Sequence, residues 1–181
     1  MGETVFSTPG SRSRSARRPG SEDSYYSLVR SNGVICFILT HTGQVVLVRQ
    51  YRPPLGRLTL EMPAGGIESD ETPAQAVARE LAEEVGYGGG HLVYIGPCRV
   101  MINREDVVEH FFVCIGAVPL PGANREAGLE TCCLSRAELE SYILADRFDQ
   151  TVALGGLFHS RATLSGPYSA RSVARDSGKI V

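Results

Sequence analysis

The sequence predicts an α/β (α+β) domain with a mixed, strand-rich core around one central helix. Short runs that favour β-strands recur between residues 24 and 134, and turn residues separate them. A strong helix pattern occupies residues 72–85, and one or two further helices are expected after residue 134. Because the strands do not alternate with helices, the pattern disfavours a parallel array of βαβ units.

The length and composition of the chain fit a single globular domain. The chain has 181 residues, of which 43% are hydrophobic and 21% are charged. Its net charge of -2 gives no general attraction to nucleic acid, so we expect no nucleic-acid partner. No apolar run approaches the about 18 residues that a membrane-spanning helix needs, so we expect no membrane partner.

The two ends of the chain are polar. Residues 1–23 are rich in Ser, Arg, Pro and Gly, and they lack the apolar stretch of a secretory signal. They share the Arg and Ser content of organellar transit peptides but form no apolar face. We therefore expect a disordered tail at 1–23, a domain over 24–165 and a polar C-terminal tail at 166–181.

The cysteines and histidines show no pattern of a disulfide framework or a zinc site. The five cysteines are an odd number without C-x-x-C spacing, and the four histidines are scattered. This usage indicates reduced thiols, and we expect a cytoplasmic protein.

Three strands are expected before the central helix. They are SYYSLVR (24–30), GVICFILT (33–40) and QVVLVRQY (44–51). The sequence HTGQ separates the last two and predicts a hairpin turn. Prolines and a glycine interrupt the pattern in RPPLGR, so residues 52–57 are expected to form a loop.

The second half of the chain predicts three more strands and then helix. The strands are HLVYIG (91–96), VEHFFVCIGAV (108–118) and GLETCCL (128–134). Ser135 and Glu138 then form a capping-box pattern ahead of LESYILA, and Asp149 can cap QTVALGGLFHSRA.

The central helix has clear boundaries. Thr72 is an N-cap residue, Pro73 suits the first helical position, and Gln75 completes a capping box. Gly86 follows Val85 as a C-terminal stop, so the helix is expected over 72–85.

The helix carries an apolar stripe beside an acidic one. At about 100° per residue, one stripe is apolar and contains Ala74, Ala78, Leu81 and Val85. Glu80, Glu83 and Glu84 share a neighbouring face because they are three and four positions apart. Such a face can simply be solvated, or it can gather the carboxylate oxygens that hard divalent cations bind.

The spacing of charged residues around this helix decides between the two interpretations. Gly65, Glu71, the Arg79-Glu80-Leu81 triplet, the Glu83-Glu84 pair and Gly86 stand at intervals that resemble the Nudix box, the signature of the Nudix hydrolase family. Only the box matches fully, and the resemblance covers roughly residues 24–165. It implies a Nudix-type α/β/α sandwich with the box as a loop-helix-loop segment. It also implies hydrolysis of diphosphates that link a nucleoside to another group, with Mg²⁺ or Mn²⁺.

The same resemblance assigns roles within the box. Glu80 and Glu84 would hold the metal, with Glu83 assisting in binding and catalysis. Arg79 would orient these carboxylates, since it stands four positions before Glu83. Gly65 would allow a tight turn near the metal, and Glu71 would tie the loop to the helix.

Residues upstream of the box indicate the substrate class. Gln50-Tyr51-Arg52 and Glu61-Met62-Pro63-Ala64-Gly65 resemble segments of the ADP-ribose and nucleotide-sugar pyrophosphatase branch. The branch implies a nucleotide-sugar substrate, a metal ligand at the Ala64 carbonyl, and a homodimer. Arg52 and Glu61 would lie at the nucleoside end of the substrate. After the box, however, Pro97 precedes Cys98 where the branch commonly has Ser-Pro-Gly.

The catalytic base is expected outside the helix, because the helix carboxylates are committed to metal. Glu105, in the loop before residues 108–118, is the first choice, because the branch carries a mobile acid there. Glu109 and Glu83 remain alternatives. Two other functions also remain open: a housecleaning nucleoside triphosphate pyrophosphohydrolase, and a non-catalytic nucleotide sensor.

Overall fold

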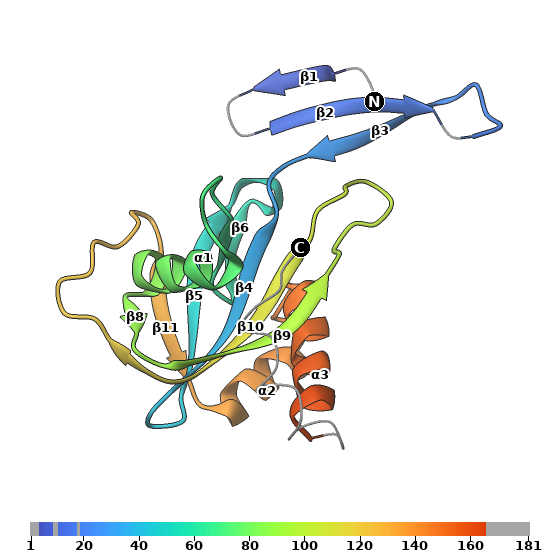
Figure 1. Cartoon of the computed structure of the whole chain (residues 1–181). Helices are drawn as coiled ribbons and strands as arrows, with labels where there is room; N and C mark the ends of the chain where they lie inside the picture. Colours follow the sequence, from blue (N-terminus) through green and yellow to red (C-terminus); the bar gives the residue numbers. More distant parts are fainter. Residues whose placement is uncertain (1–3, 9–10, 18, 166–181) are drawn as a thin grey trace.

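The computed structural model of the chain describes residues 4–8, 11–17 and 19–165 (Figure 1). The strands in these residues are β1 (Thr4–Thr8), β2 (Ser11–Arg17), β3 (Ser24–Val29), β4 (Gly33–Thr40), β5 (Val45–Arg52), β6 (Arg57–Glu61), β7 (Ala64–Gly66), β8 (Tyr87–Gly88), β9 (His91–Cys98), β10 (Glu109–Pro119) and β11 (Glu130–Leu134). The helices are α1 (Pro73–Glu80), α2 (Arg136–Leu144) and α3 (Thr151–Ser165), with a 3₁₀ turn η1 (Pro53–Leu55) and a π-helical turn η2 (Leu81–Val85). The mixed α+β class is therefore confirmed.

The eight strands β4 to β11 form one mixed sheet. Its main order is β11-β5-β4-β10-β8, while β6 pairs with β5, β7 with β4 and β9 with β10. The central pair β4 and β10 is parallel, and the other pairs are antiparallel. The helix α1 covers one face, and α2 and α3 cover the other, which makes an α/β/α sandwich (Figure 1).

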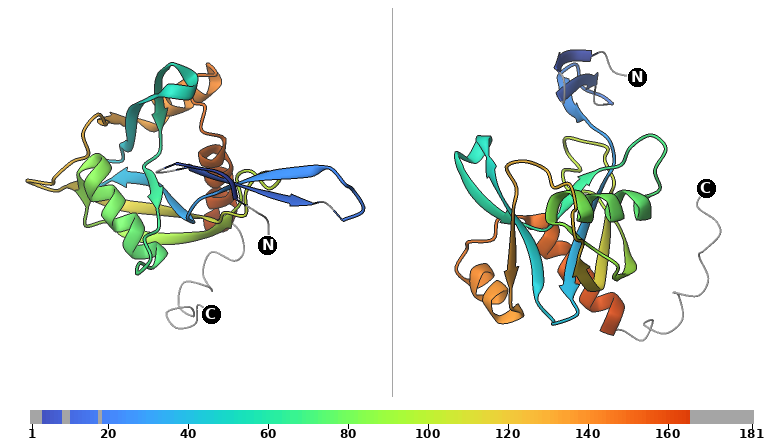
Figure 2. Two further views of the ribbon diagram at one scale, coloured as in Figure 1. Left: turned by 90° about the horizontal axis from the view of Figure 1, so that it is seen from above. Right: turned by 90° about the vertical axis from the view of Figure 1, so that its left-hand side faces the viewer.

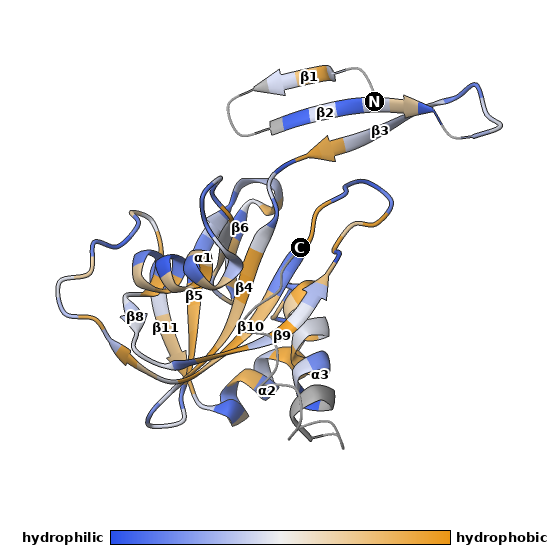
Figure 3. Ribbon diagram, in the orientation of Figure 1, coloured by the Kyte–Doolittle hydropathy of each residue, from blue (hydrophilic) through white to orange (hydrophobic). Residues whose placement is uncertain are grey.

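Alternation along the central strands explains the two apolar layers. Val34, Cys36 and Ile38 of β4 point to one face, where they pack in a buried cluster with Val77 and Leu81. The intervening side chains point to the other face. The cluster there includes Ile35, Leu47, Phe111, Leu139 and Ala153. Figure 3 shows the resulting hydrophobic colour along the strands between the helices.

The N-terminal segment differs from its prediction. Within 1–23, which was expected to be disordered, residues 4–8 and 11–17 form β1 and β2, which extend a small antiparallel sheet from β3. The paired register runs from Arg12–Val29 to Arg17–Ser24, so backbone hydrogen bonding orders the segment where burial of apolar side chains cannot. The sheet projects from the main body and exposes Phe6 (Figure 2).

The central helix has the predicted ends, and half of its predicted apolar stripe is buried, namely Leu81 and Val85. Thr72 caps it through the full capping box with Gln75, and Gly86 ends it in the left-handed conformation. From Leu81 the helix widens into the π-helical turn η2. Ala74 and Ala78, expected on the buried stripe, are exposed.

The buried positions of this helix include two carboxylates. They are Ala76, Val77, Glu80, Leu81, Glu84 and Val85. Leu81 and Val85 confirm the predicted stripe, whereas Ala76 and Val77 are buried in place of Ala74 and Ala78. The helix therefore turns Glu80 and Glu84 inward and leaves Glu83 outside.

Three smaller predictions can be compared with the structure. Residues 52–57 are not a plain loop, because β5 continues to Arg52 and the turn η1 leads directly into β6. The capping box of Ser135 and Glu138 is present. Asp149 pairs with Arg57 (2.6 Å between Oδ2 and Nη2), and α3 begins two residues later at Thr151.

The predicted C-terminal tail at 166–181 lies outside the described residues. Within the part of the chain that the structure describes, no helix has the length and apolar character needed to cross a membrane.

Candidate active site

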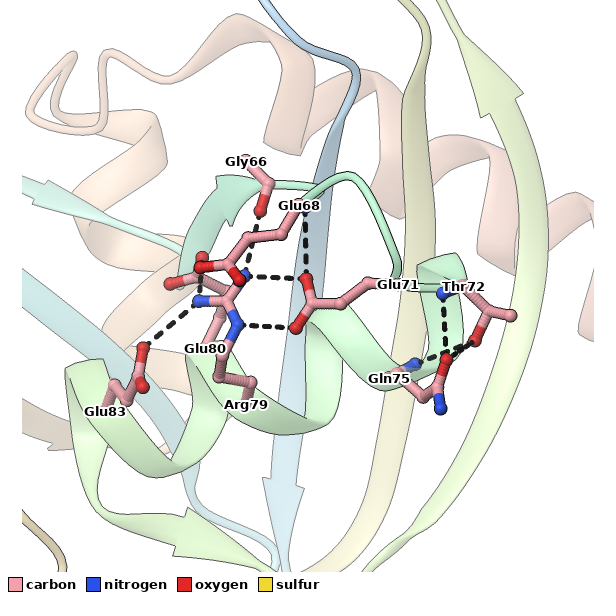
Figure 4. A network of polar contacts seen from close by, with 8 residues as sticks. All are labelled: Gly66, Glu68, Glu71, Thr72, Gln75, Arg79, Glu80 and Glu83. Carbon is pink, nitrogen blue, oxygen red and sulfur yellow. Dashed lines mark hydrogen bonds and ion pairs between the residues drawn. The ribbon is translucent and has the colours of Figure 1, made fainter.

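Arg79 organises the segment that joins β7 to the central helix (Figure 4). Its guanidinium donates to both carboxylate oxygens of Glu71 (2.7 and 3.0 Å) and to the carbonyl oxygen of Gly66 (2.9 Å). It also donates to Glu80 (2.8 Å) and Glu83 (3.1 Å) on its own helix. Arg79 thus fixes the loop against the helix and orients two carboxylates, and Glu71 ties the loop down.

Two carboxylates of the helix converge on the backbone of β7. The amide nitrogen of Ala64 donates to Oε2 of Glu84 (2.9 Å). A Cβ atom at Gly65 would collide with the carboxylate of Glu80. Gly65 is thus required by this close approach rather than by the tight turn that the sequence predicted, since it pairs with Val34 within the sheet. Glu80 and Glu84 are both buried, with relative exposures of 8% and 6%.

The buried pair Glu80 and Glu84 lacks compensating positive charge. Burial raises the pKa of Glu84 to about 7, and the negative charges of Glu80 and Glu126 act in the same direction. Burial also raises the pKa of Glu80, and the hydrogen bond from Arg79 only partly opposes this. A hard divalent cation relieves such a deficit and prefers oxygen ligands, so the carboxylates of Glu80 and Glu84 fit a Mg²⁺ or Mn²⁺ ion.

Glu83 is not gathered with this pair. Its side chain is 50% exposed and bound to Arg79. In the described residues, no group of three or more His, Cys, Asp and Glu side chains is clustered closely enough to hold a metal. The structure therefore brings Glu80 and Glu84 together with Ala64 and places Glu83 at the edge.

Arg52 and Glu61 form an ion pair beside the carboxylates. Arg52 donates to both oxygens of Glu61 (2.8 and 2.6 Å), and Thr59 adds a hydrogen bond of 2.6 Å. Burial alone would raise the pKa of Glu61, but these hydrogen bonds outweigh it and hold the pKa below its usual range. The charge of Arg52 also acts on Glu84. Because Glu61 leads directly into Met62-Pro63-Ala64, the chain places the pair next to the inward carboxylates.

The loop before β10 is less open than the sequence indicated. The side chain of Glu105, expected as a mobile acid, is only 3% exposed. Its carboxylate accepts two hydrogen bonds from Arg30 (2.9 and 3.1 Å), and the neighbouring Arg104 carbonyl accepts a bond from the Leu28 amide (2.7 Å). The backbone pairing with β3 and the ion pair with Arg30 therefore hold Glu105 buried in a fixed position.

Glu109 lies closer to the box than Glu105 does. Arg30 pairs with its Oε1 (2.7 Å), while Oε2 lies against Gly33. A Cβ atom at Gly33 would meet both the Glu109 carboxylate and the carbonyl of Gly65. Burial raises the pKa of Glu109, and Arg30 opposes the shift. Glu109 therefore borders the β7 backbone from the side opposite the helix.

Sequence reasoning missed Glu126. This exposed residue lies between β10 and β11, and its amide donates to the carbonyl of Glu83 (2.8 Å). Its negative charge raises the pKa of both Glu80 and Glu84. The available signal was an acidic residue in the polar loop PGANREAGLE, but nothing in the spacing links that loop to a helix more than 40 residues earlier.

Comparison with known protein families settles the identity of the domain. The model of the NUDIX domain matches residues 29–150, which is more than half of the chain. The chain belongs to the Nudix family. The loop-helix-loop resemblance seen in the sequence is thereby confirmed.

Several curated proteins are similar to parts of this Nudix domain. The methanol dehydrogenase activator of Bacillus methanolicus is 32% identical over 113 residues, covering 62% of this chain and 60% of the activator. The ADP-ribose pyrophosphatase of Bacillus subtilis (strain 168) is 32% identical over 96 residues, or 52% of each chain. The ADP-sugar pyrophosphatase of Mus musculus is 55% identical over 49 residues, covering 27% of this chain and 22% of the enzyme. The chain thus spans 60% or less of the length of these relatives.

A solved structure matches almost the whole fold. The crystal structure of an ADP compounds hydrolase superposes with a TM-score of 0.76 and covers 92% of this chain and 93% of that chain. The sequence identity is 21%, so the match establishes the Nudix fold alone.

Proposed function

We propose that the protein hydrolyses the diphosphate linkage of a nucleoside diphosphate sugar, with ADP-ribose or a related compound as substrate. The products would be a nucleoside monophosphate and a sugar phosphate. The observation that carries the proposal is the buried pair Glu80 and Glu84 converging on the Ala64–Gly65 backbone beside the Arg52–Glu61 ion pair. The two relatives that are named as pyrophosphatases of ADP-ribose and ADP-sugars support the substrate class.

The metal would be held by Glu80, Glu84 and the Ala64 carbonyl, with Glu83 assisting from the edge. With Mg²⁺ or Mn²⁺ bound, these residues would hold a positive charge that compensates the diphosphate and lowers the pKa of a water molecule. Arg79 keeps the helix carboxylates oriented through its fixed contacts to the loop.

Arg52 and Glu61 would contact the nucleoside end of the substrate. Arg52 is 45% exposed, so its guanidinium can meet a ligand while still paired. The Glu61 carboxylate is held ionised and can accept hydrogen bonds from sugar hydroxyls. We also propose a homodimer, in which the partner approaches this end, and a cytoplasmic location.

For the catalytic base we infer Glu126 rather than the expected Glu105. Glu105 is bound by both oxygens to Arg30 and is shielded from solvent. Glu126 is exposed, stands on a loop and is anchored by its amide to Glu83. A carboxylate there can take a proton from water near Glu80 and Glu84 and release it to solvent.

A substrate panel tests the function. Purified protein with Mg²⁺ is incubated with ADP-ribose, GDP-mannose, UDP-glucose and 8-oxo-dGTP, and the nucleotide products are separated by chromatography. We expect AMP from ADP-ribose as the fastest reaction, with no turnover in EDTA. Preference for 8-oxo-dGTP would contradict the proposal in favour of a triphosphate substrate, and no turnover of any compound would indicate a binding module.

A further inference from the structure

A cavity lined by three arginines lies between the β5–β6 edge and the end of α2. Its volume is about 450 Å³. The residues that matter for its chemistry are Arg49, Arg57, Tyr142, Asp146 and Arg147. Arg49 pairs with Leu60 across the two strands, and Arg52 lies three positions further along β5. Because side chains alternate along a strand, Arg49 and Leu60 point to the face opposite Arg52 and Glu61, so this part of the cavity faces away from the proposed active site, whereas Arg57 and Thr59 pair with Arg52 and Gln50.

The chain turns sharply to place one of these arginines. After α2, the amides of Asp146 and Arg147 donate to the carbonyls of Ile143 (3.1 Å) and Tyr142 (2.9 Å). This is the double hydrogen bond of a Schellman motif, whose left-handed position is usually glycine. Here Asp146 takes it, with φ of 54°. The motif brings Arg147 back over the last turn of the helix, with its guanidinium carbon 4.5 Å from the centre of the Tyr142 ring.

The charges of the cavity lining are unbalanced. Three arginines face one aspartate, Asp146. Arg57 is paired with Asp149 outside the lining, and Arg49 has only a long contact of 3.4 Å to Glu130. Within the described residues, Arg147 forms no ion pair. The N–H donors of its guanidinium are therefore free of carboxylate partners and available to a ligand.

We propose that this cavity binds a small molecule through a phosphate monoester group, with Arg147 as the main contact and Arg49 and Arg57 beside it. Guanidinium groups bind phosphate oxygens in pairs with fixed geometry, which makes arginine suited to this group. The cavity volume lies in the usual range of about 300–1,000 Å³ for small-molecule sites. Arg147 covers a face of the Tyr142 ring, so a nucleobase cannot stack there. The phosphate group of the ligand therefore provides the recognition.

The lining of this cavity does not include the proposed metal carboxylates Glu80 and Glu84. It shares only the β5–β6 strands with the active site, and Thr59 connects the two, because it lines the cavity while its hydroxyl donates to Glu61. A ligand bound here is in a position to alter the Arg52–Glu61 pair without touching the metal carboxylates.

Calorimetric titration in EDTA tests the proposal, because removal of metal suppresses phosphate binding at the helix carboxylates. The probes are inorganic phosphate, ribose 5-phosphate and AMP, each up to about 10 mM. We expect saturable binding by the wild-type protein, and the relative affinities of the three probes show whether sugar or nucleoside adds to the phosphate contact. Arg147→Ala and Arg49→Ala should each weaken binding at least about tenfold. Arg136→Ala, at an exposed position of α2, is the matched control and should bind normally.

Three outcomes would overturn the inference. The first is that the wild-type protein binds none of the probes. The second is that Arg147→Ala and Arg49→Ala both bind like the wild type. The third is that Arg52→Ala alone abolishes binding, which would assign the phosphate to the other face. Hydrolysis of ADP-ribose by Arg147→Ala should match the wild type when no phosphate monoester has accumulated.

Discussion

Two arginine-centred clusters of carboxylates meet at the backbone of β7, and they differ in how fully their charges are compensated. Arg79 pairs with Glu71, Glu80 and Glu83 (Figure 4). Among the described residues, Glu84 forms no ion pair and accepts a hydrogen bond from the Ala64 amide. Arg30 binds both carboxylates of its own cluster, Glu105 and Glu109. The first cluster leaves a buried negative charge for a cation to satisfy, whereas the second is closed within the protein. Under the proposed function, the first cluster would perform the chemistry and the second would stabilise the domain.

The largest effect is expected at the uncompensated carboxylate. Glu84→Gln should lower kcat with ADP-ribose by more than about 10³-fold, because a neutral amide is a poor ligand for a hard cation. The melting temperature without metal should not fall, since the substitution removes a buried charge. Steady-state kinetics and thermal unfolding measure the two effects, with exposed Glu140→Gln as control. Near-normal turnover by Glu84→Gln would place the chemistry elsewhere.

The next substitution tests whether Glu126, in the loop between β10 and β11, is the catalytic base, and not Glu105 of the Arg30 cluster. Glu126→Gln should lower kcat by about 10²-fold or more, the usual contribution of a positioned base. Mg²⁺ affinity should change little, because this residue is not expected to bind the metal. The metal dependence of turnover provides a second measurement, because the Mg²⁺ concentration that gives half-maximal rate should stay the same as in the wild type. If Glu105→Gln shows these changes and Glu126→Gln does not, the assignment of the base reverts to Glu105.

Within the closed cluster, a change should affect stability rather than chemistry. Glu105→Gln removes an ionic partner of Arg30 and should cost about 1–2 kcal/mol of unfolding free energy, the partial exposure of Arg30 limiting the loss. Denaturant unfolding gives this value. We expect kcat to stay within a factor of about three at temperatures where the variant is folded. An unchanged unfolding midpoint would show that the pair contributes nothing to the stability of the domain.

A smaller effect should appear as a dependence of metal stabilisation on pH. The raised pKa of Glu84, about 7, means that in EDTA its burial is tolerated at low pH and destabilises the fold as pH rises through that value, and the raised pKa of Glu80 acts in the same direction. Mg²⁺ should therefore raise the melting temperature more at pH 8 than at pH 5.5. Equal shifts at both pH values would mean that the cation does not bind this pair.

The parts of the site that depend on local sequence were predictable, and the parts that depend on the sheet were not. Thr72, Gln75 and Gly86 define the helix through contacts within a few residues, and the structure confirms them. The buried face of that helix is chosen by the sheet, which selects Val77 in place of Ala78. Side-chain periodicity cannot decide which face is buried, because alanine at positions 74, 76 and 78 is compatible with either burial or exposure.

Long-range contacts explain the remaining errors. Arg30 binds Glu105 across 75 positions of sequence, so the loop looked open when only its own residues were considered. The pairing of β2 with β3 likewise depends on backbone hydrogen bonds that polar composition does not reveal. Glu126 shows the same limit, since its amide contacts the carbonyl of Glu83 across 43 positions of sequence.

The contact at Gly33 has a consequence for protein engineering. A Cβ atom there would collide with Glu109 and press on the Gly65 carbonyl, so the Nudix-box segment depends on a glycine in the adjacent strand β4. Transplanting residues 65–87 into another scaffold would therefore fail unless the recipient strand offers a glycine at the matching register. The transferable unit is a three-part insert consisting of the segment, the neighbouring glycine and the start of β10.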